Sequence, residues 1–164
     1  MAARILLVDD ELAVLKAWTK ALRHAGHHVT CASSPDAALV AADEHIFDVI
    51  IVDYVMPAMT GVELLARIRK KQPLARAIVV SGRIEGTLTE DEIRSTIQEA
   101  VEADFYLHKP VSNDRLREAV SAITAEAHTL GWEEMAKRVI ASKGVKLKAT
   151  KAVERKIKPK LKKR

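Results

Sequence analysis

Four apolar runs in this sequence each end on a polar residue of a different chemical kind. The runs cover residues 5–8, 49–52, 77–80 and 105–108, and the residues that follow them are Asp9 with Asp10, Asp53, Ser81 and Lys109. If the runs are parallel strands of one sheet, their carboxyl ends lie side by side at one edge. Three carboxylates, one hydroxyl and one ammonium would then meet there. Such a set can hold a divalent cation and a phosphoryl group.

These residue types suit phosphoryl chemistry for separate physical reasons. Magnesium prefers oxygen ligands and is commonly bound by one or two carboxylates plus phosphate oxygens. Three neighbouring acids repel one another, and a bound cation relieves that repulsion. A carboxylate can also attack phosphorus and form an acyl phosphate. The oxygens of the transferred phosphoryl group then need neutralising, which a cation, the Lys109 ammonium and a hydroxyl can share.

The segments between the runs have helical spacing, so the sequence predicts repeated strand–helix units around a parallel sheet. Nearly continuous apolar strands are typical of a sheet covered by helices on both faces. Right-handed crossovers then give an α/β, doubly wound sheet of five parallel strands with five helices by about residue 128. In such sheets ligands bind beyond the carboxyl ends of the strands.

The expected helices have recognisable starts and apolar faces. The predicted N-caps are Ser34 before Pro35, Thr60 with Glu63, Thr89 with Glu92, and Ser112 or Asn113. The predicted inner faces are Leu12, Leu15, Trp18 and Leu22 in the first helix, and Ala38, Leu39, Ala42 and Ile46 in the second. They continue with Leu64, Leu65 and Ile68 in the third, Ile93, Ile97 and Val101 in the fourth, and Leu116, Val120 and Ile123 in the fifth.

The composition fits one domain plus an extension. The chain has 164 residues and a single cysteine, Cys31, so no intrachain disulfide is expected and a reducing, cytoplasmic setting is the simple interpretation. Cys31 lies in an apolar stretch and is predicted to be a buried small hydrophobe. No apolar run approaches the roughly 20 residues that span a bilayer, and the first residues do not resemble a signal peptide. The six histidines form no metal-ligand pattern.

The charge is divided unevenly along the chain. Residues 137–164 contain thirteen Lys or Arg and one Glu, a net charge of +12, whereas residues 1–136 carry −7. We therefore expect a domain over 3–128 and a basic extension over 129–164 that is partly helical or disordered. Three hypotheses for the basic residues stay open. They bind nucleic acid without sequence specificity, they dock on an acidic protein or anionic membrane, or they are uncommitted or fold against the acidic body.

The ordered motifs resemble the receiver domain of bacterial two-component response regulators, of the chemotaxis-regulator type, over roughly residues 3–127. The resemblance rests on Val8-Asp9-Asp10-Glu11, then Asp53-Tyr54-Val55-Met56-Pro57 with Gly61, then Ser81-Gly82, then Lys109-Pro110. Any one of these motifs alone is weak, but four in the family's order, each closing an apolar run, are specific. The resemblance implies the flavodoxin-like receiver fold.

The resemblance also implies a role for each matching residue. Asp53 matches the phosphoacceptor, Asp9 and Asp10 match the acidic pair that binds Mg²⁺, and Val55 matches the residue whose backbone carbonyl completes the metal site. Ser81 matches the hydroxyl that turns toward the phosphoryl group, and Lys109 matches the lysine that pairs with that group. Pro110 matches the residue after a cis peptide bond, and Tyr106 matches the aromatic switch residue. Taken alone, Tyr106 could equally be a half-buried strand aromatic.

The implied function is a phosphorylation-controlled switch. A sensor histidine kinase or phosphotransfer protein would donate a phosphoryl group to Asp53 in a Mg²⁺-dependent reaction, and the altered conformation would control a downstream protein. Such a domain catalyses only its own phosphotransfer and dephosphorylation, so it is not a turnover enzyme. A homodimer through the last helix–strand–helix face is a further expectation.

Some positions depart from the family pattern, and two rival hypotheses remain. Residues 83–88 form a lengthened loop after Ser81, and Glu102-Ala103-Asp104 stands where Gly-Ala is common. One rival is a receiver-like module that never uses phosphate, although a complete acid, hydroxyl and lysine set speaks against it. The other is a haloacid-dehalogenase-type hydrolase, which usually has a second Asp where Val55 stands.

Overall fold

The computed structural model describes residues 2–82 and 103–129, and the chain divides into two units, Met1–Thr129 and Leu130–Arg164. The expected fourth helix with its Thr89 cap and the lengthened loop at 83–88 lie outside the described residues. So does the basic extension, whose predicted helical or disordered character stays a prediction. Among the described residues, no helix has the length and apolar character needed to cross a membrane.

The sheet has five parallel strands, as the sequence predicts. They are β1 (Arg4–Val8), β2 (His28–Ala32), β3 (Val49–Asp53), β4 (Arg76–Ser81) and β5 (Phe105–His108), in the spatial order β2-β1-β3-β4-β5. All neighbouring strands are parallel. In the pairings β1–β3, β3–β4 and β4–β5, Val8 lies opposite Val52, Asp53 opposite Val80, and Ser81 opposite His108. These pairings bring the carboxyl ends of β1, β3, β4 and β5 to one edge.

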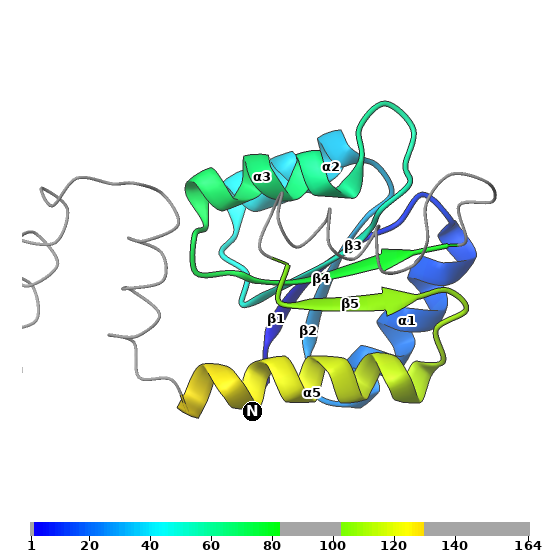
Figure 1. The fold of residues 1–164 in the computed structure, drawn as a ribbon, viewed down its shortest axis with the longest axis vertical. Helices are drawn as coiled ribbons and strands as arrows, with labels where there is room; N and C mark the ends of the chain where they lie inside the picture. Colours follow the sequence, from blue (N-terminus) through cyan, green and yellow to red (C-terminus); the bar gives the residue numbers. More distant parts are fainter. Residues whose placement is uncertain (1, 83–102, 130–164) are drawn as a thin grey trace, which may run out of the picture. The chain divides into compact units, whose positions relative to one another are not determined.

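Helices cover both faces of this sheet. On one face lie α2 (Pro35–Glu44) and α3 (Gly61–Lys71), and on the other lie α1 (Leu12–His24) and α5 (Asn113–Thr129) (Figure 1). Each face has its own apolar core, because alternate strand residues point to opposite sides. Leu6, Ile50 and Val79 belong to the core under α2 and α3, while Leu7 and Ile78 belong to the core under α1 and α5. The doubly wound α/β fold is thereby confirmed.

The described helix starts follow the expected chemistry. The Ser34 hydroxyl accepts a hydrogen bond from the Ala37 N–H at 3.2 Å, and Thr60 forms a full capping box with Glu63. At the start of α5 the Ser112 hydroxyl accepts from the Arg115 N–H at 3.2 Å. These side chains satisfy backbone donors that a helix N-terminus leaves without partners.

Two residues predicted for inner helix faces are exposed instead. Leu12 is 71% exposed and Ile46 is 58% exposed. Leu12 is the first residue of α1, and Ile46 follows the end of α2 at Glu44. Helical spacing identifies a face but not the residues at which packing begins and ends, so both predictions were wrong.

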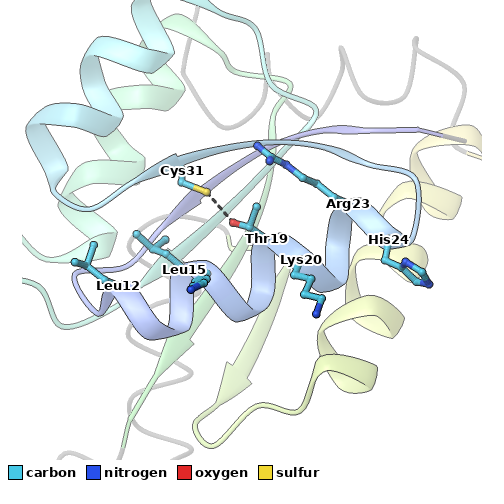
Figure 2. Close-up of a pocket in the computed structure, with 8 residues that line it drawn as sticks. Leu12, Leu15, Thr19, Lys20, Arg23, His24 and Cys31 are labelled. Atoms are coloured by element: carbon cyan, nitrogen blue, oxygen red, sulfur yellow. Dashed lines mark hydrogen bonds between the residues drawn. The ribbon is translucent and has the colours of Figure 1, made fainter.

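Cys31 is also exposed, contrary to the prediction that it is buried. It lies on β2, an edge strand of the sheet, beside an open groove along α1 (Figure 2). Its sulfur lies 2.8 Å from the Thr19 hydroxyl. The groove is also lined by Leu12 and by the cations Lys16, Lys20 and Arg23. An apolar sequence context did not reveal that this strand has only one neighbour.

The amino ends of the strands are held by a carboxylate that the sequence marked only as a departure from the family pattern. Asp104, just before β5, accepts hydrogen bonds from Arg69 Nη2 at 3.0 Å and from the Ala77 N–H at 2.8 Å. Its other oxygen lies 3.1 Å from Arg76 Nε, and its side chain is only 18% exposed. Asp104 therefore joins α3, β4 and the start of β5 at the edge opposite the predicted site.

Replacing Asp104 by Ala should destabilise the fold by about 2–4 kcal/mol, because it leaves two largely buried guanidinium groups without this carboxylate. Urea denaturation followed by circular dichroism measures the change. Asp48→Ala is a matched control, since Asp48 also accepts a backbone N–H, from Arg4 at 2.7 Å, but is 48% exposed. Equal losses for the two variants would contradict a special role for Asp104.

Candidate functional site

The site lies at the edge where β1, β3 and β5 end. Asp9 and Asp10 directly follow β1, Asp53 is the last residue of β3, and Lys109 directly follows β5. Apolar, buried residues of β1 and β3 lead up to Asp9 and Asp53, so both carboxylates stand where a buried strand ends. The structure therefore brings together the predicted carboxylates and the predicted ammonium from segments that are far apart in the chain.

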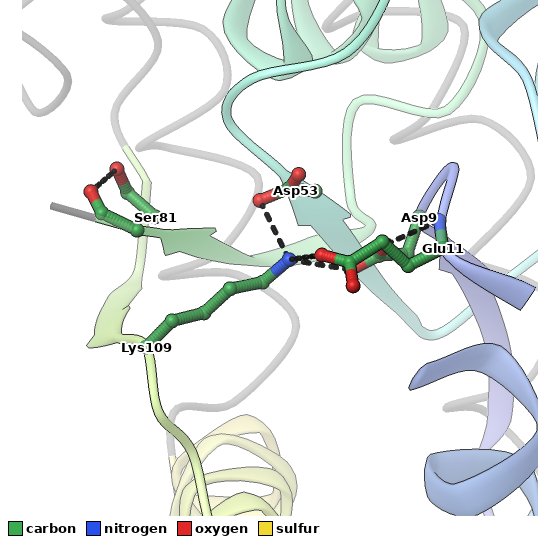
Figure 3. Close-up of polar contacts among 6 residues, drawn as sticks. Asp9, Glu11, Asp53, Ser81 and Lys109 are labelled. Atoms are coloured by element: carbon green, nitrogen blue, oxygen red, sulfur yellow. Dashed lines mark hydrogen bonds and ion pairs between the residues drawn. The ribbon is translucent and has the colours of Figure 1, made fainter. Parts of the chain in front are cut away.

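The Lys109 ammonium stands at the centre of the polar contacts (Figure 3). Its Nζ lies 3.0 Å from Asp9 Oδ2, 3.4 Å from Asp53 Oδ1 and 3.5 Å from Glu11 Oε1. Asp9 is fully buried and Asp53 is 6% exposed, whereas the Glu11 side chain is 63% exposed. One cation thus offsets two buried carboxylates and reaches a third at the surface.

The three aspartates form a candidate metal site. One carboxylate oxygen from each of Asp9, Asp10 and Asp53 lies within 4.8 Å of the other two, the one such cluster among the described residues. Asp53 Oδ1 is buried and accepts no well-formed hydrogen bond, although Lys109 Nζ lies nearby. A buried carboxylate oxygen with spare acceptor capacity, beside a second buried acid and an exposed one, fits a hard divalent cation.

The electrostatics of Asp53 and Lys109 reflect this crowding. Burial raises the pKa of Asp53 to about 6 against the opposing attraction of Lys109, and the charges of Asp9 and Asp10 add to the rise. Burial alone would lower the pKa of Lys109, but its hydrogen bond with Asp9 and the charges of Asp53 and Asp9 raise it above the ordinary value. In the metal-free site the ammonium is therefore firmly charged, while Asp53 titrates near pH 6.

Ser81 lies at the same edge, but its side chain forms no hydrogen bond with Asp53 or Lys109 here. Its hydroxyl donates to the Gly82 carbonyl oxygen at 2.9 Å, away from Asp53 and Lys109 (Figure 3). Tyr106 is half-buried on β5 and packs against the core under α2 and α3. Its hydroxyl is buried with no hydrogen-bond partner among the described residues. The predicted switch roles of both residues stay predictions.

Backbone hydrogen bonds tie the strand ends to one another. The Tyr54 N–H donates to the Val80 carbonyl at 2.6 Å, and the Lys109 N–H donates to the Ser81 carbonyl at 2.7 Å. The peptide bond between Lys109 and Pro110 is cis, in agreement with what the resemblance implies. Val55, whose carbonyl is a predicted metal ligand, has a side chain that is 55% exposed at this edge.

The loop after Asp53 is fixed by a tight turn and a close contact. The Met59 N–H donates to the Pro57 carbonyl at 2.9 Å around Ala58, which has φ 70°, so the chain makes a γ-turn of the rarer, strained kind. The Gly61 N–H then donates to the Tyr54 carbonyl at 2.9 Å. A Cβ on Gly61 would lie 2.1 Å from the Asp53 carbonyl oxygen. Only glycine allows the start of α3 to press against the end of β3.

Glu11 is the contact residue that sequence reasoning missed. In the sequence it is only the last residue of the motif Val8-Asp9-Asp10-Glu11, and the motif assigns it no role. Its N–H donates to Asp9 Oδ1 at 2.9 Å, and its carboxylate faces Lys109. A third consecutive acid at a strand end was the available signal, but nothing local shows that its partner is nearly one hundred residues away.

A family model for the response regulator receiver domain matches residues 5–121. The chain is 33% identical over 118 residues to the alginate biosynthesis transcriptional regulatory protein AlgB of Pseudomonas aeruginosa, and 36% identical over 127 residues to the transcriptional regulatory protein KdpE of Mycobacterium tuberculosis. These alignments cover 72% and 75% of this chain, but only 25% and 53% of the relatives' own lengths. The chain therefore spans a part of these regulators.

A solved structure is similar along its whole length. The CheY-like response regulator receiver domain protein of Methanospirillum hungatei superposes with a TM-score of 0.70 at 28% identity, over 80% of this chain and 100% of that protein. The residues matched by the family model include Asp9, Asp10 and Asp53 of the acidic cluster.

Gly61→Ala should cost about 3 kcal/mol of stability, because the new methyl group overlaps the Asp53 backbone and forces α3 away from β3. Urea denaturation measures this loss. Gly82→Ala is the matched control, since a Cβ there meets no described atom within 4 Å, and it should change stability by about 0.5 kcal/mol or less. If the two variants are equally stable, the close contact at Gly61 is not a constraint on the fold.

Asp53→Asn should stabilise the metal-free protein at neutral and higher pH. The folded-state pKa of about 6 exceeds the ordinary 3.8, so the folded protein binds more protons than the unfolded chain between these values, and stability falls as pH rises through that range. The charged carboxylate then costs about 1–3 kcal/mol above pH 7, allowing for partial solvent screening.

Denaturation of both proteins in chelator between pH 4 and 8 tests this expectation. The stability advantage of Asp53→Asn should be largest at pH 8 and shrink toward pH 4, where Asp53 is protonated in the folded protein and partly protonated in the unfolded chain. Glu44→Gln, which changes an exposed acid at the end of α2, should show no comparable pH trend. An advantage that is constant with pH, or absent, would contradict the raised pKa of Asp53.

Proposed function

This chain belongs to the response regulator receiver domain family, and we propose that it is a phosphorylation-controlled switch. The receiver domain is homologous to those of two-component response regulators, in which phosphorylation on an aspartate and dependence on Mg²⁺ are general features. Family membership decides against the haloacid-dehalogenase hypothesis. It leaves open which residues of this chain act and whether they remain competent.

Asp53 is the phosphoacceptor in this proposal. The supporting observation is its position, because it is a buried carboxylate at the end of the central strand β3, with one oxygen lacking a full hydrogen-bond partner and an ammonium 3.4 Å away. An Asp53 oxygen attacks the phosphorus of a phosphohistidine on the partner. The phosphorus–nitrogen bond breaks as the acyl phosphate bond forms, and the histidine nitrogen leaves with the electron pair and takes up a proton.

Asp9, Asp10, Asp53 and the backbone carbonyl of Val55 are the residues that would hold Mg²⁺. The three carboxylates have the spacing and oxygen chemistry that such an ion prefers. When bound, the cation supplies positive charge that neutralises the phosphoryl oxygens. Asp53 then meets the donor as a carboxylate rather than an acid at neutral pH, since its pKa is about 6 even without the cation.

Lys109 and Ser81 sense the modification in this proposal. The phosphoryl group adds negative charge beside Lys109, and the ammonium exchanges its contact with the Asp53 carboxylate for a charge-assisted hydrogen bond to the new group. Ser81 gives up its hydrogen bond to Gly82 and turns its hydroxyl toward the same group. Tyr106, two residues along β5 from the strand end, moves inward as Ser81 moves. Two arrangements of this edge then differ in affinity for a downstream protein.

The remaining parts of the proposal concern the chain's context. A sensor histidine kinase or phosphotransfer protein supplies the phosphoryl group in the cytoplasm, and the domain acts as a switch that catalyses only its own phosphorylation and dephosphorylation. A homodimer through the face of the last helix, strand and helix is a further candidate output. The charge of +12 over 137–164 favours an acidic protein or nucleic acid as an additional partner.

Asp53→Asn should abolish phosphorylation, because the amide nitrogen and oxygen are far weaker nucleophiles than a carboxylate. Intact-mass spectrometry after incubation with acetyl phosphate and Mg²⁺ should show one added phosphoryl group on the natural protein and none on the variant. Omitting Mg²⁺ should also prevent the addition.

Glu63→Gln is the matched control, since it changes an exposed acid in the Thr60 capping box without touching the carboxylate cluster. It should be phosphorylated like the natural protein. Stoichiometric labelling of Asp53→Asn would show that another residue is the acceptor. No labelling of the natural protein by acetyl phosphate or by a phosphorylated kinase would favour a receiver-like module that does not use phosphate.

A further inference from the structure

The three acceptors around the Lys109 ammonium are not equivalent. Asp9 and Asp53 are buried and belong to the carboxylate cluster that would hold a cation, whereas Glu11 is exposed and lies outside that cluster. A divalent cation and the Lys109 ammonium therefore compete for the same two carboxylates. The cation also repels the ammonium at short range. Glu11 is the one acceptor of Lys109 for which the cation does not compete directly.

Glu11 is also held in place by contacts that do not involve its carboxylate. Its N–H donates to Asp9 Oδ1 at 2.9 Å, and its carbonyl accepts from the Leu15 N–H at 3.1 Å in the first turn of α1. The backbone of Glu11 thus couples the end of β1 to the start of α1, beside the site. The backbone is therefore fixed within side-chain reach of Lys109, and the side-chain rotamers decide whether the carboxylate meets the ammonium.

Glu11 occupies a helix N-cap position, but its side chain does not cap the helix. It is the N-cap residue of α1, where Ser, Thr, Asp and Asn are favoured because they hydrogen-bond to the helix N-terminus. Glu11 makes no such capping bond, whereas Ser34 and Thr60 do so at α2 and α3. Its carboxylate faces Lys109 Nζ at 3.5 Å instead. The simplest alternative is an ordinary surface ion pair of no consequence.

We propose that Glu11 is a positioning residue that retains the Lys109 ammonium at the site when a cation occupies Asp9 and Asp53. Lys109 Nζ lies 3.0 Å from the buried Asp9 and 3.4 Å from the buried Asp53, whereas the exposed Glu11 is the most distant of the three at 3.5 Å. Once the two buried carboxylates are engaged, Glu11 becomes the main anion for the ammonium. Lys109 then stays at the surface side of the site, where the proposed function needs it to meet the incoming phosphoryl group, so this inference rests on that function.

A double-mutant cycle on Mg²⁺ affinity tests the inference without any phosphorylation. Glu11→Gln should weaken Mg²⁺ binding roughly two- to fivefold, the range of an exposed ion pair, because the displaced ammonium has lost its alternative acceptor. In a Lys109→Gln background the same change should have a clearly smaller effect. If Lys109 does not move when Mg²⁺ binds, Glu11→Gln should change the Mg²⁺ affinity equally with Lys109 present and with Lys109 replaced by Gln. A difference between these two changes therefore measures the repositioning of Lys109.

The dissociation constants can be measured by NMR titration of the full chain with MgCl₂ at fixed ionic strength. Glu44→Gln removes the same charge from an exposed position at the end of α2 and should leave the affinity unchanged. Equal effects of Glu11→Gln with and without Lys109 overturn the inference. Absence of Mg²⁺ binding in the natural protein overturns both the inference and the metal-dependent function. Mg²⁺ binding without energetic coupling between Glu11 and Lys109 overturns the inference alone.

A crystal structure of the natural protein with Mg²⁺ gives a second measurement, which also decides the matter if Lys109→Gln does not fold. Lys109 Nζ should lie within ion-pair distance of the Glu11 carboxylate and farther from Asp9 than the present 3.0 Å. An ammonium that remains on Asp9, or that leaves Glu11 for solvent, would overturn the inference.

Discussion

The site depends on one ammonium that stands between two buried carboxylates. Removing Asp9 and Asp53 from water is costly, and the cost is bearable only with a partner cation at short range. Lys109 supplies that cation at 3.0 and 3.4 Å, but a single positive charge faces Asp9, Asp53 and the exposed Asp10. The remaining negative charge raises the pKa of Asp53 together with burial. The site is therefore left with net negative charge, which would favour a second cation there.

This arrangement constrains the whole sheet, since its members come from β1, β3 and β5. The strand order places β3 centrally, with β1 on one side and β4 followed by β5 on the other. Gly61 lets α3 begin directly against the Asp53 backbone, and Lys109 is fixed through its N–H bond to Ser81. At the other edge Asp104 anchors α3 and β4 to the start of β5. Contacts between distant segments therefore hold the sheet at both its carboxyl and its amino edge.

The sequence predicted the sheet and most of the site because both follow from local patterns. Apolar runs define strands, and parallel strands align their carboxyl ends, so Asp9, Asp53 and Lys109 were brought together by topology alone. The failures have a common origin in tertiary context. The spacing of apolar residues cannot show that Leu12, at the start of α1, is exposed, or that Cys31 lies on an edge strand. The ion pairs of Glu11 and Asp104 join distant segments, so no local signal assigns their partners.

Two hydroxyls near the site, those of Tyr106 and Ser81, bear on the proposed switch. Tyr106 keeps a buried hydroxyl without a hydrogen-bond partner among the described residues, a condition that typically costs about 1–3 kcal/mol. The Ser81 hydroxyl, two residues farther along the paired strands, makes only a local bond to Gly82. In the proposed switch the Ser81 hydroxyl would exchange this local bond for a charge-assisted one. Because a two-state equilibrium inverts from 1:99 to 99:1 with about 5.5 kcal/mol, the few charge-assisted hydrogen bonds that a phosphoryl group on Asp53 would gain are of sufficient size to reverse it.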